Sequence, residues 1–182
     1  MQLRLTHIFL IGLMLSALGM PSAGAQCLDV GTYHSPKGFG LCADKQVSDR
    51  SFESYTILAD VTGVLLGTRA SIGGKGTYTY NFVFARGVVD SNVPVDFYAG
   101  PGVTAGFVRD LNTDYGVVFG LSGTLGCKAH FTRNVSIGLD VGTDLAMFFT
   151  KGRRYGNIDI TSYKAGLVRS FYPQLRLMYS FK

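Results

Sequence analysis

The sequence lacks tryptophan, contains only three cysteines and five prolines, and is poor in charge, with charged residues making up 16% of its 182 residues. Beyond residue 25 it has no uninterrupted run of about 18 apolar residues, which excludes a membrane-spanning helix there. Its basic residues are scattered rather than clustered, which argues against nucleic-acid binding. The cysteines and histidines do not have the spacing of a metal site. The chain is instead rich in glycine, with 24 residues, and in tyrosine and phenylalanine, with 10 and 13.

The first 25 residues are typical of an export signal. Arg4 supplies the positive end, IFLIGLMLSAL the apolar stretch, and Ala-Gly-Ala at 23–25 the cleavage site. We therefore expect one mature domain over 26–182, with 16 Lys and Arg against 12 Asp and Glu, since the signal contains one basic residue and no acidic one. A lipid anchor on Cys27 is disfavoured, because Gln26 before it is large and polar.

The stretch from Tyr115 to Phe149 alternates between two faces. Odd positions are mostly large and apolar, whereas even positions are mostly glycine, serine, threonine or charged residues. Only the segment 132–134, Thr-Arg-Asn, interrupts the pattern. Because successive side chains of a strand point to opposite faces, the pattern predicts two long strands joined by a tight turn. Each exceeds the roughly 9–11 residues that a tilted strand needs to cross a bilayer.

The same alternation recurs along the rest of the mature chain. It appears in a hairpin of LDVGTYH and KGFGLCA and in the segments 52–66, 77–85, 95–108 and 174–182. Polar or glycine-rich stretches at 44–51, 67–76 and 86–94 are predicted as turns or loops, and 150–173 as a long loop with a helical turn at SYKAGLVRS. We count eight strands, the even number usual in bacterial single-chain barrels.

The composition of the polar face predicts which side of the barrel is the interior. A soluble barrel exposes long polar side chains, but here that face is rich in glycine, which suits a narrow lumen filled by side chains. We predict an all-β, eight-stranded, antiparallel up-and-down transmembrane β-barrel with a plugged lumen rather than a pore. A soluble periplasmic lipocalin-like ligand-binding barrel is the alternative. The expected lumenal polar network comprises Asp60, Asp96, Lys128, His130, Asp140, Asp144 and Arg176.

An export signal, alternating strands and a last strand ending in LMYSF resemble the small eight-stranded outer-membrane barrels of Gram-negative bacteria, the OmpA/OmpX type of architecture. The chain also resembles uncharacterised outer-membrane β-barrel proteins that end in an RSFYP segment, here 169–173, and a short final strand, here 174–181. The resemblance implies residence in the outer membrane and insertion by the barrel-assembly machinery. Recognition by that machinery usually favours an aromatic last residue, whereas here Lys182 follows Phe181. The resemblance implies no particular activity.

Loop lengths then predict the topology. Periplasmic turns are short, so 132–134 should face the periplasm, and 34–37, 67–76, 109–114 and 150–172 the outside. Positive groups near the lipid surface can bind phosphates of lipopolysaccharide. The candidate residues of the last loop are Lys151, Arg153, Arg154, Lys164 and Arg169.

The sequence offers little for catalysis. Cys127 and His130 lie on opposite faces of one strand, so they cannot form a nucleophile and base. His130 and Thr132 approach the His-x-Ser arrangement of a lipid A deacylase, which stays an alternative, but the predicted topology places them at the periplasmic end. Cys27 and Cys42 fall opposite each other in the first hairpin if it turns at Ser35-Pro36, and we predict a disulfide there. We expect no catalytic residues, metal, cofactor or nucleic-acid partner, and the oligomeric state is left open.

Overall fold

The computed structural model describes residues 27–35, 38–61, 73–89, 92–110, 115–152, 157–168 and 173–181, so the expected export signal lies outside the described residues. The elements are strands with one short helix. In chain order they are β1 (Leu28–Ser35), β2 (Gly38–Ser48), β3 (Ser51–Asp60), β4 (Gly73–Val89), β5 (Val93–Arg109), β6 (Tyr115–His130), β7 (Val135–Lys151), β8 (Ile158–Ser162), α3 (Lys164–Val168) and β9 (Gln174–Phe181).

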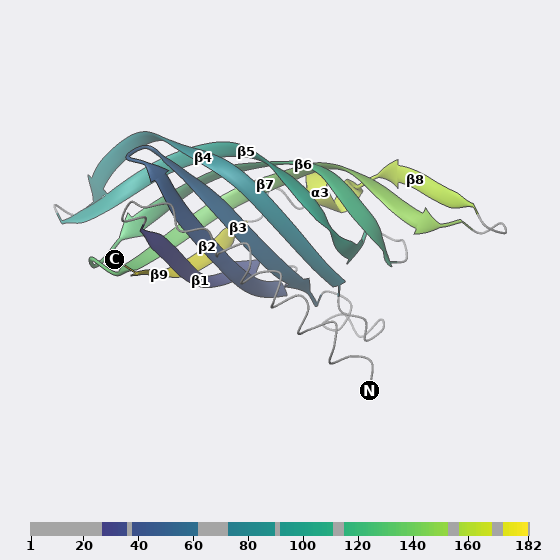
Figure 1. The fold of residues 1–182 in the computed structure, drawn as a ribbon, viewed down its shortest axis with the longest axis horizontal. Coiled ribbons are helices and arrows are strands. Elements are labelled where there is room, and N and C mark those ends of the chain that lie inside the picture. The colour runs from purple at the N-terminus through teal and green to yellow at the C-terminus, as the bar shows by residue number, and fades with distance from the viewer. Residues whose placement is uncertain are drawn as a thin grey trace.

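Eight of these strands form a closed antiparallel ring (Figure 1). Strands β1 to β7 pair in chain order, and β9 closes the ring by pairing with β7 on one side and β1 on the other. The predicted eight-stranded, antiparallel up-and-down barrel is confirmed. Strand β8 is additional and pairs only with the end of β7, outside the ring. Among the described residues, no helix has the length and apolar character needed to cross a membrane.

The strand register fixes the tilt of the strands. Pairing partners traced from His34 through β2 to β6 lead to Phe149 on β7, whereas the other way round, through Leu175, they lead to Leu139. These two β7 residues are ten positions apart, so one circuit of the ring displaces the register by ten residues. For eight strands this corresponds to a tilt of about 41°, and to a lumen that side chains fill.

The two sides of the ring differ in height. Strands β4 to β7, which we call the high wall, have 16 or 17 residues each, whereas β1, β2, β3 and β9, the low wall, have 8 to 11. We call the end with the turns 49–50 and 131–134 the lower end. In Figure 1 the barrel lies on its side, with the lower end at the left and the opposite, upper end at the right. The upper ends of the strands reach farther to the right from β1 to β7, and β8 lies beyond them. Strand β9 reaches β7 only over Val135–Asp140, and β8 covers the same edge over Met147–Lys151.

Large apolar side chains point outwards and polar ones inwards, as the alternation predicted. On β6, Leu121 is 64% exposed and its neighbour Ser122 only 7%. The fully buried side chains include Arg176, with small apolar clusters nearer the two ends of the lumen. The barrel therefore has a largely polar interior and an apolar outer surface.

Several predicted boundaries were wrong. The turn expected at 44–51 occupies only 49–50, because β2 continues to Ser48, and the loop expected at 67–76 gives way to β4 from Gly73. The turn expected at 86–94 shortens too, since β4 runs to Val89 and β5 starts at Val93. The helical turn expected in the last loop is present as α3, but β8 was not predicted.

Candidate functional site

The lumen is where the polar side chains of different strands meet. At its centre lies Arg176 of β9, which is 2% exposed. Its guanidinium donates to Asp44 of β2 at 2.7 Å and to Ser54 of β3 at 2.6 Å, and it forms an ion pair with Asp140 of β7 at 3.3 Å. Because a guanidinium has five donors in a fixed plane, one residue ties three strands together.

Asp44 extends this network to the other wall. Its second carboxylate oxygen accepts from Lys128 Nζ of β6 at 2.5 Å, and Lys128 also reaches Asp29 of β1 at 3.2 Å. The ammonium lies 4.8 Å from the centre of the Phe52 ring, a favourable position for a cation. We call Asp29, Asp44, Lys128, Asp140 and Arg176 the charged hub.

A glycine makes room for one further contact of the hub. The hydroxyl of Tyr98, on β5, donates to Asp140 Oδ1 across the lumen. A Cβ at Gly126 would lie 2.2 Å from that carboxylate oxygen and 2.8 Å from the Tyr98 hydroxyl. Only glycine therefore fits at this position of β6. With Tyr98 and Arg176 fully buried, the lumen is filled at this level, as expected for a plugged barrel.

Above the hub lies a second ion pair beside a cavity. Lys75 of β4 contacts Asp144 of β7, whose other oxygen accepts from the Ser122 hydroxyl at 3.0 Å. The cavity has a volume of about 60 Å³ and is lined by this pair, by hydroxyl side chains and by Gln174. It lies between the charged hub and α3.

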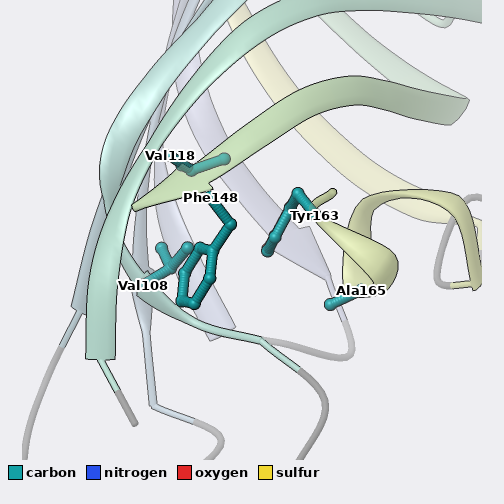
Figure 2. Close-up of a cluster of buried hydrophobic side chains, with 5 residues drawn as sticks. All are labelled: Val108, Val118, Phe148, Tyr163 and Ala165. Atoms are coloured by element: carbon teal, nitrogen blue, oxygen red, sulfur yellow. The ribbon is translucent and has the colours of Figure 1, made fainter. Parts of the chain in front are cut away.

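The upper mouth is closed by apolar packing (Figure 2). Val108, Val118 and Phe148 of the high wall pack against Tyr163, which precedes α3, and Ala165, in its first turn. The Tyr163 and Phe148 rings stack with their centres 6.0 Å apart. We call this set the upper cluster. Asp110 holds the start of α3 by accepting the backbone N–H groups of Lys164 at 3.1 Å and Ala165 at 2.6 Å.

The lower mouth holds a separate polar group. Asp96 of β5 pairs with His130 of β6 at 3.3 Å and with Arg86 of β4 at 3.2 Å. The Thr132 hydroxyl, in the next turn, accepts the backbone N–H groups of Asn134 and Val135 at 3.3 and 3.0 Å. This hydroxyl acts as a turn cap rather than as a partner of His130.

The seven predicted lumenal residues all point inwards but do not form one network. Lys128, Asp140 and Arg176 meet in the hub, Asp144 lies above it, and the Asp96–His130 pair lies at the lower mouth. Asp60 is buried at the upper end of β3. No three His, Cys, Asp or Glu side chains of the described residues are arranged to hold a metal ion.

The predicted disulfide between Cys27 and Cys42 was wrong. Cys42 pairs with Gly31, and the carbonyl of Cys27 accepts the N–H of Gln46, so the two cysteines are four rows apart, or roughly 13 Å along the strand. All three thiols are free. Cys42 is buried in the lumen and contacts the Thr32 carbonyl at 3.6 Å.

The predicted basic loop is only partly described. Lys151 ends β7 and Lys164 begins α3, and both are exposed at the upper end. Arg153, Arg154 and Arg169 lie outside the described residues.

Sequence reasoning missed three charged residues of the lumen. Asp29 lies in the first hairpin, and Asp44 and Lys75 fell in stretches assigned to a turn and a loop. The signal was available for Asp44, because the alternation of β2 continues from Cys42 through it to Gln46. A polar residue continuing a strand's inward face should be kept in the strand.

No protein-family model matches the sequence, and a comparison with curated proteins finds no significant match. Among solved structures, the crystal structure of Neisserial surface protein A (NspA) is similar to this chain, with 14% sequence identity and a TM-score of 0.43. The match covers 88% of this chain and 97% of that one. The strand pairings themselves, rather than this distant likeness, establish the eight-stranded barrel.

Proposed function

We propose that the protein is an outer-membrane β-barrel with a structural or surface-interaction role in the cell envelope and no catalytic activity. The observation that carries this proposal is the distribution of side chains, which is the inverse of that in a soluble protein: charged side chains face the lumen and apolar side chains cover the outer surface. Along β6, alternate residues exposed on the outer surface are Val117, Phe119, Leu121 and Leu125, each at least half exposed. Soluble monomers rarely expose an apolar surface of this extent.

Closure of the ring supports the same location. Lipid offers no partners for backbone N–H and C=O groups, so a sheet can span a bilayer only when it has no open edge. Here β9 pairs with β1 and with Val135–Asp140 of β7, so the ring has no open edge over this height.

The two alternatives are less well supported. A lipocalin-like barrel would need an apolar ligand cavity, whereas the cavity here is lined by Lys75, Asp144 and hydroxyl groups. A deacylase built on His130 would need a free hydroxyl beside it, but the Thr132 hydroxyl caps a turn. The imidazole of His130 contacts Asp96 instead.

The proposed topology places the lower end in the periplasm and the upper end outside. The turns 49–50 and 131–134 are short, as periplasmic turns are, and the longer connections, including the one containing β8 and α3, lie at the other end. The basic residues there, Lys151 and Lys164 among them, would meet lipopolysaccharide phosphates, and insertion would use the barrel-assembly machinery.

Fractionation of cells tests the proposal. We expect the protein in the outer-membrane fraction, with an unboiled form that migrates differently from the boiled form on a detergent gel. Lipid A from an overexpressing strain should have an unchanged mass spectrum. Recovery in a detergent-free periplasmic extract would contradict the membrane location, and shortened lipid A chains that disappear in His130→Ala would contradict the non-catalytic role.

A further inference from the structure

The cavity between the charged hub and α3 has hydrogen-bonding groups that the protein itself leaves unused. Among the described residues, no protein group is hydrogen-bonded to the hydroxyls of Thr56 and Thr124 or to the side-chain nitrogen of Gln174, and all three residues line the cavity. They come from β3, β6 and β9, so they surround the space. All three residues are half-buried, and polar groups that face a cavity in the lumen take polar partners, so the contents of the cavity are polar.

The charges beside the cavity are already matched. Lys75 contacts Asp144, and Arg176 contacts both Asp140 and Asp44. A charged ligand would have to break one of these buried pairs and leave a charge without its partner, which is strongly unfavourable. An uncharged ligand whose hydroxyl groups both donate and accept would leave the ion pairs intact.

The space available limits the size of the ligand. A volume of about 60 Å³ corresponds to roughly four water molecules, counting about 15 Å³ for each. At its side lies Gly142, the cross-strand neighbour of Thr124. A Cβ there would lie 3.6 Å from Gln174 Oε1 and 3.7 Å from Nε2, so a methyl group fits and would occupy part of the space.

The roof of the cavity is a segment that is not part of the ring. Ala165 and Gly166 of α3 line the cavity from above. The helix is a single turn, too short to be stable alone, and depends on Asp110 and the upper cluster. Below the cavity, Arg176 and Tyr98 close the lumen. Withdrawal of α3 would therefore open the cavity to the upper end without opening a pore through the barrel.

We propose that this cavity is a binding site for a small uncharged polyhydroxyl molecule of about the size of glycerol, which enters from the upper end when α3 withdraws. The site depends on the lumen alone and therefore does not rest on the membrane location proposed above.

Saturation-transfer NMR with glycerol as the probe tests this site. The mature chain is refolded in lauryldimethylamine oxide micelles, and folding of every variant is checked by its unboiled gel mobility. We expect saturable transfer to glycerol, weakened about fivefold or more in Thr124→Val, which keeps the shape and removes one hydrogen-bonding group. Gly142→Ala should also weaken the transfer, because the added methyl group occupies part of the space. Thr143→Val, the neighbouring but outward-facing position, is the matched control and should bind as the parent does.

Three results would overturn the proposal. One is the absence of saturable transfer in a folded parent protein, which would mean that the cavity holds water only. Another is equal transfer in Thr124→Val, Gly142→Ala and the control, which would place glycerol elsewhere. The third is tighter binding of glycerol 3-phosphate than of glycerol, which would mean that the ion pairs open for a charged ligand.

Discussion

The high wall and the low wall are parts of one ring but contribute to the lumen in different ways. The low wall supplies Asp29, Asp44 and Arg176 to the charged hub, so ion pairs join it to β6 and β7 across the lower half of the lumen. In the upper half the low wall is too short to face the high wall. There β5, β6 and β7 pack against Tyr163 and α3 instead.

The barrel is therefore closed in two different ways. Where the two walls face each other, a charged side chain anchored on one wall can reach an oppositely charged side chain on the other wall, across the lumen. Where only one wall is present, no partner strand exists, and a loop segment covers the exposed apolar side chains. The first closure is part of the ring, whereas the second can be lost while the ring persists. Substitutions in the charged hub and in the segment of Tyr163 and α3 should therefore act on the two closures separately.

Asp44→Ala should have the largest effect. It would leave Lys128 and Arg176 buried without their shared carboxylate, and removing one partner of a buried ion pair costs about 3–5 kcal/mol. The temperature at which the unboiled gel form converts to the boiled form should fall sharply. Asp49→Ala, an exposed aspartate in the same hairpin, is the control and should convert near the parent temperature. Similar behaviour of the two variants would mean that the hub does not hold the walls together.

Leu121→Arg should come next. On the outer face of β6 it would place a charge in lipid, at a cost of about 2–4 kcal/mol near the bilayer midplane. Ile160→Arg, on β8 at the top of the high wall, should cost far less. The outward apolar run of β6, from Tyr115 to Phe131, extends roughly 40 Å along the barrel axis, whereas the apolar band of a membrane barrel is about 25 Å tall. The top of the high wall, with β8, should therefore stand above the bilayer. The free energy of unfolding of each variant is measured by urea denaturation in the presence of lipid vesicles. Equal losses in the two variants would contradict a position of β8 above the bilayer.

Tyr163→Ala should act on the second closure alone. Loss of the ring stacked on Phe148 undoes the upper cluster, so amide hydrogens in 158–168 should exchange faster while those of β1 and β9 keep their protection. Leu167→Ala, an exposed position on the same helix, should exchange like the parent. Hydrogen exchange followed by mass spectrometry gives both results. Faster exchange throughout the barrel would mean that the two closures are coupled.

Asp110→Ala should have the smallest effect. It removes the carboxylate that accepts the first N–H groups of α3, and such caps contribute about 1 kcal/mol. Exchange in 158–168 should rise about fivefold, in the same experiment, without a change in conversion temperature. Asp159→Ala, an exposed aspartate on β8, serves as its control.

Much of the barrel was predictable from the sequence because alternation is a local property. The inward and outward faces of β6 and β7 follow directly from the residues between Tyr115 and Phe149, and the strand count follows from the repeated pattern. Sequence reasoning failed where polar residues continue a strand. Asp44 and Lys75 resemble turn and loop residues, since in most sheets a charge in mid-strand is rare.

Other features depend on parts of the chain that are distant in sequence. Strand β9 begins at Gln174 and reaches β7 only up to Asp140, so the upper edge of β7 is available to β8. The segment IDITS alone does not reveal that such an edge exists. The pairing of Cys42 with Gly31 depends on the register of the first hairpin, in which Ser35 pairs with Gly38, and this register places Cys27 beyond the reach of Cys42. The contact of Asp110 with α3 joins residues more than 50 positions apart.

The closing strand has a consequence for how the chain must be made and inserted. Because β9 completes both the β1 and the β7 ladders, a chain cut short before Gln174 has two open edges, whatever else it has folded. Open edges are templates for pairing with other chains. The earlier strands must therefore be kept from pairing with other chains until the last eight strand residues are in place, and we expect a copy cut short before Gln174 to aggregate rather than to form a smaller barrel.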